Sequence, residues 1–124
     1  MYPNDRKYSK EHEWVLVEGE AAKLGITDFA QGELGDVVFL EMPGVGDRVQ
    51  AGAECGTIEA VKTVAQLFAP LSGKIEEINT ALEKDASLIN QDPYGEGWIM
   101  RIDLSNTGEL DSLLTADAYR AQVS

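Results

Sequence analysis

The sequence predicts a mainly β protein built from two interlocked β halves. Runs of β-branched, aromatic and aliphatic residues alternate with turns marked by glycine and proline along most of its 124 residues. One outline also recurs: a strand, a turn, a short strand and a glycine-marked return, once around residues 37–59 and again around 74–100. Because 44% of the residues are hydrophobic, the chain can bury one core, and we expect a single domain over residues 1–124.

The first predicted elements are a hairpin and a short helix. Residues 13–18 and 21–26 are β-like runs on either side of a glycine turn, which predicts two paired strands. Thr27 can then cap a brief helix over residues 29–34. Gly35 is a natural stop for this helix, because glycine readily adopts the backbone conformation that ends helices.

Four β-like runs follow in the middle of the chain, separated by turn residues. They cover residues 36–42, 46–52, 54–59 and 63–69. We expect the last two to pair as a hairpin with Lys62 at or beside its turn, although no Asn-Gly pair fixes the turn position.

The last part of the chain is predicted to combine strands with short helices. The expected elements are a strand over residues 74–78, a helical turn over 81–84, a turn cluster over 92–97, a strand over 98–102 and a helical tail within 108–123. Asn79 can cap the helical turn, and leucines at helical spacing mark the tail.

Charge and cysteine content argue against several classes of protein. The 22 acidic and 10 basic residues give a formal net charge of -12, so we expect neither a nucleic acid nor an anionic membrane as a partner. No apolar run is long enough to span a membrane and no targeting segment is evident, so a cytoplasmic location is expected. Cys55 is the only cysteine, and we interpret it as an inert residue of the core.

The sequence predicts neither an independent enzyme nor a metal site. His12 is the only histidine, and in a strand its neighbours Glu11 and Glu13 would point to the opposite face. A structural or solvated role for His12 is favoured over that of a catalytic base, because no nucleophile completes a catalytic group. Glycine-rich phosphate-binding motifs are missing from the sequence.

Lys62 is the residue most open to a chemical role. A lysine at a β-turn is usually a solvated charge, but this one lies near the middle of the chain between uncharged neighbours. The run GTIEAVKT at 56–63, followed by APLSG at 69–73, resembles the lipoyl-lysine hairpin of the glycine cleavage system H-protein family.

The resemblance extends over nearly the whole chain. Further matching motifs are YSKEHEWV at 8–15, LGITDFAQ at 24–31, LGDVVF at 34–39 and LINQDPYGEGW at 88–98. The resemblance implies a barrel-sandwich hybrid of two small antiparallel sheets, with short helices and a helical C-terminus. It also implies that lipoic acid is attached to Lys62 and that the protein is a carrier with no turnover of its own.

The resemblance implies particular partners as well. They are a pyridoxal-phosphate glycine decarboxylase, a tetrahydrofolate-dependent aminomethyltransferase, a dihydrolipoyl dehydrogenase with FAD, and a lipoate ligase or lipoyl/octanoyl transferase. The carrier would shuttle the aminomethyl group of glycine from the decarboxylase to the aminomethyltransferase and be reoxidised by the dihydrolipoyl dehydrogenase.

The resemblance also suggests roles for three further residues. By position, Glu13 and His12 are candidates for a cleft that receives the loaded arm, and Glu59 is a candidate for recognition of the hairpin by the lipoylating enzyme. For each of the two glutamates, the alternative is an ordinary solvated acid.

The sequence departs from the family close to the lysine. Where the family commonly has Glu-Ser-Val-Lys and then Ser-Asp, this chain has Ala60, Ala65 and Gln66. These changes remove groups that could form hydrogen bonds with the loaded arm or with a partner. The alternative function is therefore that of an H-like protein, which donates lipoyl groups to other lipoate-dependent proteins or serves as their scaffold. Lipoyl domains of 2-oxoacid dehydrogenases, with Asp-Lys-Ala, and biotinyl carriers, with Met-Lys-Met, fit less well.

Overall fold

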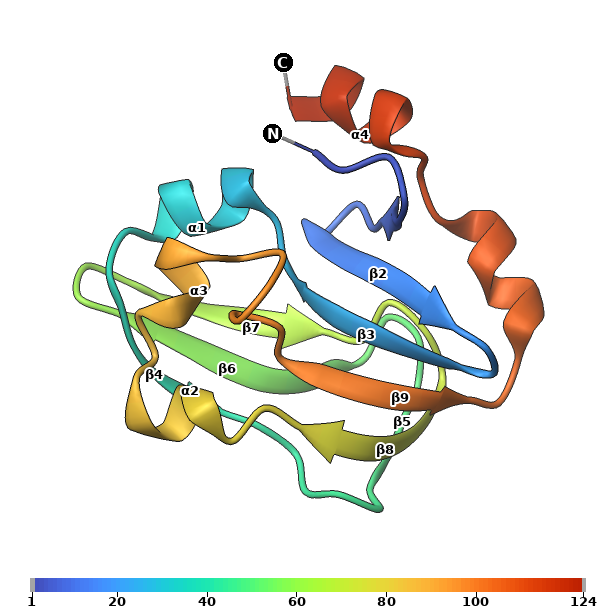
Figure 1. Cartoon of the computed structure of the whole chain (residues 1–124), viewed down its shortest axis with the longest axis horizontal. Helices are drawn as coiled ribbons and strands as arrows, with labels where there is room; N and C mark the ends of the chain where they lie inside the picture. The colour runs from blue at the N-terminus through green and yellow to red at the C-terminus, as the bar shows by residue number, and fades with distance from the viewer. Residues whose placement is uncertain (1, 124) are drawn as a thin grey trace.

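Two antiparallel sheets form the body of the molecule in a computed structural model, which describes residues 2–123 (Figure 1). The six-stranded sheet has the order β1 (Lys7–Tyr8), β2 (Glu13–Glu18), β3 (Ala21–Ile26), β9 (Met100–Leu104), β8 (Gly73–Ile78) and β5 (Arg48–Val49). The three-stranded sheet has the order β4 (Val37–Glu41), β6 (Glu54–Ala60) and β7 (Val64–Phe68). Since β5 pairs with β8, the segment 37–60 contributes strands to both sheets, with β4 and β6 in the three-stranded sheet and β5 at the edge of the six-stranded sheet.

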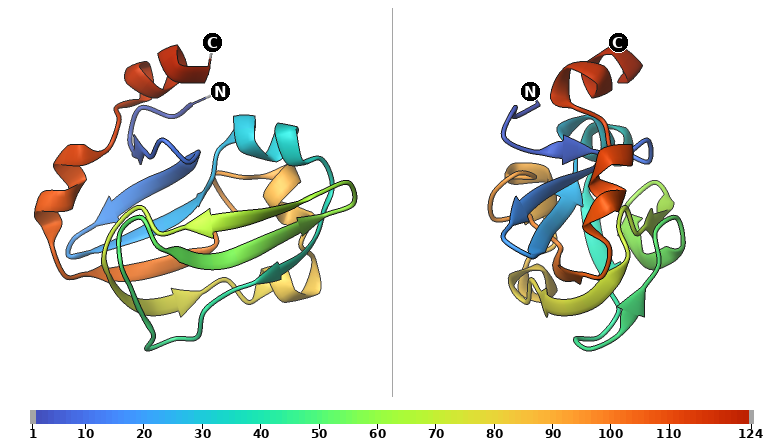
Figure 2. Two further views of the ribbon diagram at one scale, coloured as in Figure 1. Left: turned by 180° about the vertical axis from the view of Figure 1, so that it is seen from behind. Right: turned by 90° about the vertical axis from the view of Figure 1, so that its right-hand side faces the viewer.

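Short helices lie around the two sheets. They are α1 (Asp28–Leu34), α2 (Ala81–Lys84), α3 (Leu88–Gln91), the 3-10 helix η1 (Thr107–Ser112) and α4 (Ala116–Val123). The first three gather at one end of the sheets, whereas η1 lies at the opposite end and α4 lies beside the N-terminal segment (Figure 2). Among the helices of residues 2–123, none has the length and apolar character that a membrane span requires.

The main core is formed by inward-facing residues of both sheets. Its members are almost completely buried and include Leu24, Ile58, Leu67, Ile75 and Ile102. Alternate residues of a strand point to opposite faces, so Leu24 and Ile26 of β3, like Met100 and Ile102 of β9, both face this core. A second cluster of Tyr8, Trp14, Ala116 and Tyr119 fixes α4 to the first strands.

The expected fold class is confirmed, including the helical C-terminus, and several elements lie where the sequence predicts them. β2 and β3 form the first hairpin, and β6 and β7 form the lysine hairpin. Thr27 caps α1 by accepting a hydrogen bond from the Ala30 N–H at 3.2 Å. Gly35 ends α1 with φ +77°, a conformation that glycine adopts without the steric cost that a β-carbon brings.

The second half of the chain departs from the expected repeat. The helical turn expected over 81–84 is present as α2, but the short strand of the repeated outline does not form, and α3 was not predicted. The strand expected over 98–102 occupies residues 100–104 instead, because the carbonyl of Trp98 accepts a hydrogen bond from Asn79 Nδ2 at 2.7 Å rather than joining the sheet.

The helical tail is interrupted. Leu114 forms an isolated β-bridge with Tyr8, with backbone N–H to O distances of 2.7 and 2.8 Å. This pairing requires extended backbone and therefore separates η1 from α4.

Candidate functional site

Lys62 lies at the tip of the β6–β7 hairpin. Glu59 pairs with Val64, and the Ala60 N–H donates to the Thr63 carbonyl at 2.8 Å, so Val61 and Lys62 form the turn. Both turn residues are exposed, and Val61 retains 75% of its accessible surface. The hairpin projects from one end of the molecule (Figures 1 and 2), which leaves the lysine accessible to another protein.

The hairpin tip is anchored to the end of α1. The Val61 N–H donates to the Asp36 carbonyl at 2.9 Å. The aliphatic part of Lys62 lies over Gly35, where a β-carbon would stand 3.2 Å from Lys62 Cε. Asn90 of α3 holds the same segment, since its Oδ1 accepts from the Val37 N–H at 2.9 Å and its Nδ2 donates to the Gly35 carbonyl at 2.8 Å. The amine therefore sits beside the C-terminal end of α1.

A cleft of about 280 Å³ opens between α1, the turn before β2 and the β6–β7 hairpin. Apolar side chains dominate its surface, and three glutamates contribute carboxylates. Its lining residues are Glu11, His12, Glu13, Ile26, Phe29, Ala30, Glu33, Leu34, Ile58, Ala65, Gln66 and Leu67. Glu33 and Leu34 directly precede Gly35, so one wall of the cleft runs up to the position of the Lys62 side chain.

Glu13 is a buried acid in this cleft, with 2% of its surface exposed. Its Oε1 accepts a hydrogen bond from Ser9 Oγ at 2.6 Å, and its Oε2 accepts one from the Phe68 N–H at 3.2 Å. Burial raises the pKa of Glu13 to about 7, with a smaller increase from the nearby Glu11 carboxylate, and the two hydrogen bonds oppose the increase. Glu13 can therefore gain or lose a proton near neutral pH.

His12 lines the same cleft but is not in a strand. It lies immediately before β2 with φ +68°, so the strand alternation considered for Glu11, His12 and Glu13 does not apply. Its Nδ1 is 2.7 Å from the Tyr119 hydroxyl, and its ring centroid is 5.0 Å from that of Phe29. Over residues 2–123, His, Cys, Asp and Glu side chains form no group of three or more that could hold a metal ion.

Glu59 is separate from the cleft. It is exposed in β6, directly opposite Phe39 of β4 and Val64 of β7, both of which are also exposed. Side chains of directly paired residues share one face of a sheet, so Glu59 belongs to the outer face of the three-stranded sheet. The sequence-derived candidates therefore form two groups, with Glu13 and His12 in the cleft and Glu59 outside it.

The three departures from the family pattern have different surroundings. Ala65 and Gln66 both contribute to the cleft. Ala60 is 6% exposed and belongs to the interior, so a methyl group there contributes to packing. The cleft residues Phe29 and Glu33 were not predicted from the sequence, since neither residue carries a local signal that distinguishes a cleft wall from an ordinary helix face.

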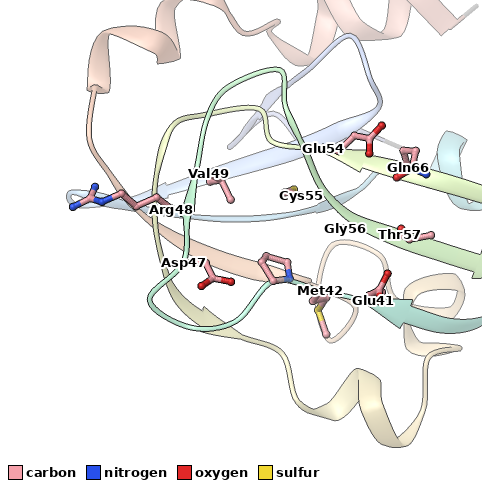
Figure 3. Close-up of a pocket in the computed structure, with 11 residues that line it drawn as sticks. Glu41, Met42, Asp47, Arg48, Val49, Glu54, Cys55, Gly56, Thr57 and Gln66 are labelled. Carbon is pink, nitrogen blue, oxygen red and sulfur yellow. The ribbon is translucent and has the colours of Figure 1, made fainter.

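A larger opening of about 600 Å³ lies on another side of β6 (Figure 3). Glu41, Asp47, Arg48 and Cys55 are among its lining residues. Cys55 is 8% exposed, and burial, with a smaller effect of the Glu13 carboxylate, raises the pKa of its thiol to about 12. The thiol is therefore protonated at neutral pH, which agrees with the predicted role as an inert core residue.

Known proteins resemble this chain over almost its full length. The family model described as "Glycine cleavage H-protein" matches residues 6–124. The glycine cleavage system H protein of Symbiobacterium thermophilum is 58% identical over 119 residues, which cover 96% of this chain and 93% of that protein. That of Bacteroides thetaiotaomicron is 50% identical over 123 residues, covering 99% and 98%. The crystal structure of a glycine cleavage system H protein from Mycobacterium marinum superposes with a TM-score of 0.90 at 43% identity, covering 98% of both chains.

Proposed function

The chain belongs to the glycine cleavage H-protein family, and on this premise we propose that it carries a lipoyl group on Nζ of Lys62. The observation that supports the assignment best is the position of this residue, an exposed lysine in a two-residue turn whose side chain starts at the edge of a cleft. An exposed primary amine can form an amide with the carboxyl group of lipoic acid without disturbing the hairpin.

The cleft beside Lys62 fits the attached group. Ile26, Ile58 and Leu67 provide an apolar surface suited to a hydrocarbon chain, whereas the carboxylates of Glu11, Glu13 and Glu33 suit a cationic amine. When attached, the dithiolane supplies a sulfur that accepts the aminomethyl group of glycine and a disulfide that is restored by oxidation. The protein's own residues bind this arm and shield it from water.

Glu13 and His12 are proposed as residues of the arm cleft. An amine that binds near Glu13 favours the ionised form of this carboxyl group, because opposite charges attract strongly where water is scarce. The Ser9 hydroxyl and the Phe68 N–H hold the carboxylate in place, so it meets the arm with a fixed orientation.

The surface around Lys62 is proposed to meet several enzymes in turn. These are the glycine decarboxylase, the aminomethyltransferase and the dihydrolipoyl dehydrogenase of the glycine cleavage system. Glu59 lies on the exposed face beside the hairpin turn, and we propose that the lipoate ligase or lipoyl/octanoyl transferase recognises it there. The net charge of -12 favours partners with basic rims. In this scheme the chain itself performs no turnover; its single-domain organisation and cytoplasmic location stay predictions.

The first experiment is the intact mass of the protein purified from lipoate-replete cells, with peptide mapping around Lys62. A mass increase of one lipoyl group on Lys62 is expected, and Lys62→Arg should abolish it while the melting temperature is kept. An unmodified Lys62 would contradict the assignment.

A second experiment addresses the carrier role itself. The lipoylated protein should support exchange of carbon dioxide with glycine when mixed with the decarboxylase. Failure of this exchange, together with transfer of the lipoyl group to another apoprotein, would instead support the donor alternative. Ala65 and Gln66, which stand where the family commonly has Ser-Asp, line the cleft, so this comparison tests whether the carrier role persists without those two side chains.

A further inference from the structure

The hydroxyl group of Tyr119 contacts two of the segments that form the cleft, although Tyr119 itself does not line it. Tyr119 of α4 is completely buried, and its hydroxyl oxygen is 2.7 Å from His12 Nδ1 and 2.7 Å from Thr27 Oγ1. His12 belongs to the turn before β2, and Thr27 caps α1 through the Ala30 N–H. The C-terminal helix is thereby connected to both segments.

These two segments form adjacent parts of the cleft lining. His12 and Phe29 both line it, and their ring centroids are 5.0 Å apart. The Thr27 N–H also donates to the His12 carbonyl at 3.0 Å, so the segments are connected through the backbone as well. His12 adopts a left-handed conformation with φ +68°, which is disfavoured for a residue with a β-carbon and therefore depends on such contacts.

The hydroxyl group is suited to a double contact. A tyrosine hydroxyl donates one hydrogen bond and accepts others, so it can satisfy His12 and Thr27 together. Burial raises the pKa of Tyr119 to about 12, and this keeps the proton on the oxygen at neutral pH. The ring is held independently, since it stacks on Tyr8 at 4.9 Å and contacts Tyr2 edge-on at 5.2 Å.

We propose that Tyr119 is a positioning residue of the arm cleft, whose hydroxyl holds the His12 turn and the start of α1 at the separation that admits the arm and excludes bulk water. The inference rests on the proposed function, because it assumes that the loaded arm occupies this cleft. It assigns the C-terminal helix a part in protecting the cargo although that helix contributes no lining residue of the cleft.

Tyr119→Phe is the direct test, because it removes the hydroxyl and keeps the ring in its aromatic cluster. Tyr8→Phe is the matched control. It removes a buried tyrosine hydroxyl from the same cluster, where the Tyr8 hydroxyl donates to the Pro3 carbonyl at 2.6 Å and does not contact the cleft.

The first readout needs no lipoyl group. His12 is the only histidine, so its imidazole gives one assignable set of NMR signals. Tyr119→Phe should shift these signals, because it removes the hydroxyl 2.7 Å from His12 Nδ1, whereas Tyr8→Phe should leave them as in the wild type. Identical His12 signals in the wild type and Tyr119→Phe would overturn the proposal.

The second readout is protection of the cargo. Water attacks the methylene carbon of the loaded arm, the carbon–sulfur bond breaks, and the products are a thiol, formaldehyde and ammonia. After removal of the decarboxylase, Tyr119→Phe should release formaldehyde at least about threefold faster than the wild type, and Tyr8→Phe at the wild-type rate. Equal rates in all three proteins, with a protected wild type, would overturn the positioning role alone.

A lipoylated wild type that releases its cargo as fast as a free dihydrolipoamide adduct would contradict the proposal that the cleft protects the arm, and with it this inference.

A measurement on the wild type alone covers the case in which Tyr119→Phe folds poorly. The Tyr119 hydroxyl proton of the wild type should exchange slowly with water and show NMR contacts to both His12 and Thr27. Rapid exchange of this proton would overturn the proposal.

Discussion

Phe68 donates its backbone N–H to Oε2 of Glu13 across 3.2 Å, and this bond joins the end of β7 to the start of β2, two strands of different sheets. Ser9 Oγ satisfies the other carboxylate oxygen. The two sheets are thus connected at one edge by a buried titratable group, and protonation of this group affects the stability of the fold.

Glu13 should make the folded protein less stable as the pH rises from about 4.5 to 7. The pKa of Glu13 is about 7 in the folded state and 4.5 as its ordinary value, so between these values the folded state retains a proton that the unfolded chain has lost. The stabilisation by this proton is fully present below pH 4.5 and lost as the pH passes 7. The difference corresponds to about 3 kcal/mol.

Urea unfolding of the wild type and Glu13→Gln at pH 5 and pH 8 measures this effect. The amide of the variant has no titrating proton, so the free energy of unfolding of the wild type should fall relative to the variant by about 2.5 kcal/mol between the two values. Any constant offset from the altered hydrogen bonds cancels in this comparison. Glu59→Gln, at an exposed position, should show no such change, and a pH-independent difference for Glu13→Gln would contradict the prediction.

Gly73→Ala should destabilise the fold by about 3 kcal/mol, since overpacking forces neighbours to shift. A β-carbon at Gly73 would clash with the Asp103 carbonyl oxygen and lie 2.5 Å from Ile102 Cγ2, where β8 pairs with β9. Gly32→Ala is the control. Gly32 is exposed in α1 with nothing within 4 Å of its would-be β-carbon, so alanine should stabilise the protein by up to about 1 kcal/mol. Urea unfolding of both variants measures the contrast, and equal changes would contradict it.

Cys55 should react with iodoacetamide much more slowly in the folded protein than in urea. The thiolate is the reactive form, and the pKa of this thiol is raised from 9.0 to about 12. Three pKa units correspond to about a thousandfold less thiolate at pH 8. The modification rate, followed by mass spectrometry with and without urea, checks this; similar rates in both conditions would show that the thiol is accessible in the folded state.

Asn90→Ala should lower the free energy of unfolding by about 2 kcal/mol, because it leaves the Val37 N–H and the Gly35 carbonyl without their side-chain partner. Chemical denaturation measures the loss, and hydrogen exchange at the Val37 amide should accelerate. Asn106→Ala removes the exposed cap at the Gly108 N–H and should cost at most about 1 kcal/mol. An Asn90 variant as stable as the Asn106 variant would argue against the anchoring role.

The local parts of this fold could be predicted from the sequence, and the contacts between distant segments could not. The lysine hairpin and the Thr27 cap depend on residues a few positions apart, so turn and capping preferences reveal them. The bond between His12 and Tyr119 spans 107 positions, and Asn90 reaches back 53 positions to Val37. Neither contact leaves a periodic signal.

The interruption of the helical tail has the same origin. The spacing of its leucines indicates one helical region, but Leu114 pairs with Tyr8, and β1 itself has only two residues. A strand this short carries no alternation to detect. The candidate residues of the cleft were therefore predictable mainly through the family resemblance, whereas its walls required the structure.

The pairing of β3 with β9 also sets an order of events during synthesis. Ala21 lies opposite Asp103, so the six-stranded sheet cannot close until most of the chain has left the ribosome. The lysine hairpin joins neighbouring strands through a two-residue turn and can form much earlier, because local contacts cost less chain entropy to make. The nascent chain thus displays Lys62 before Tyr119 has been translated, and a modifying enzyme that needs only the hairpin could act on it before the fold is complete.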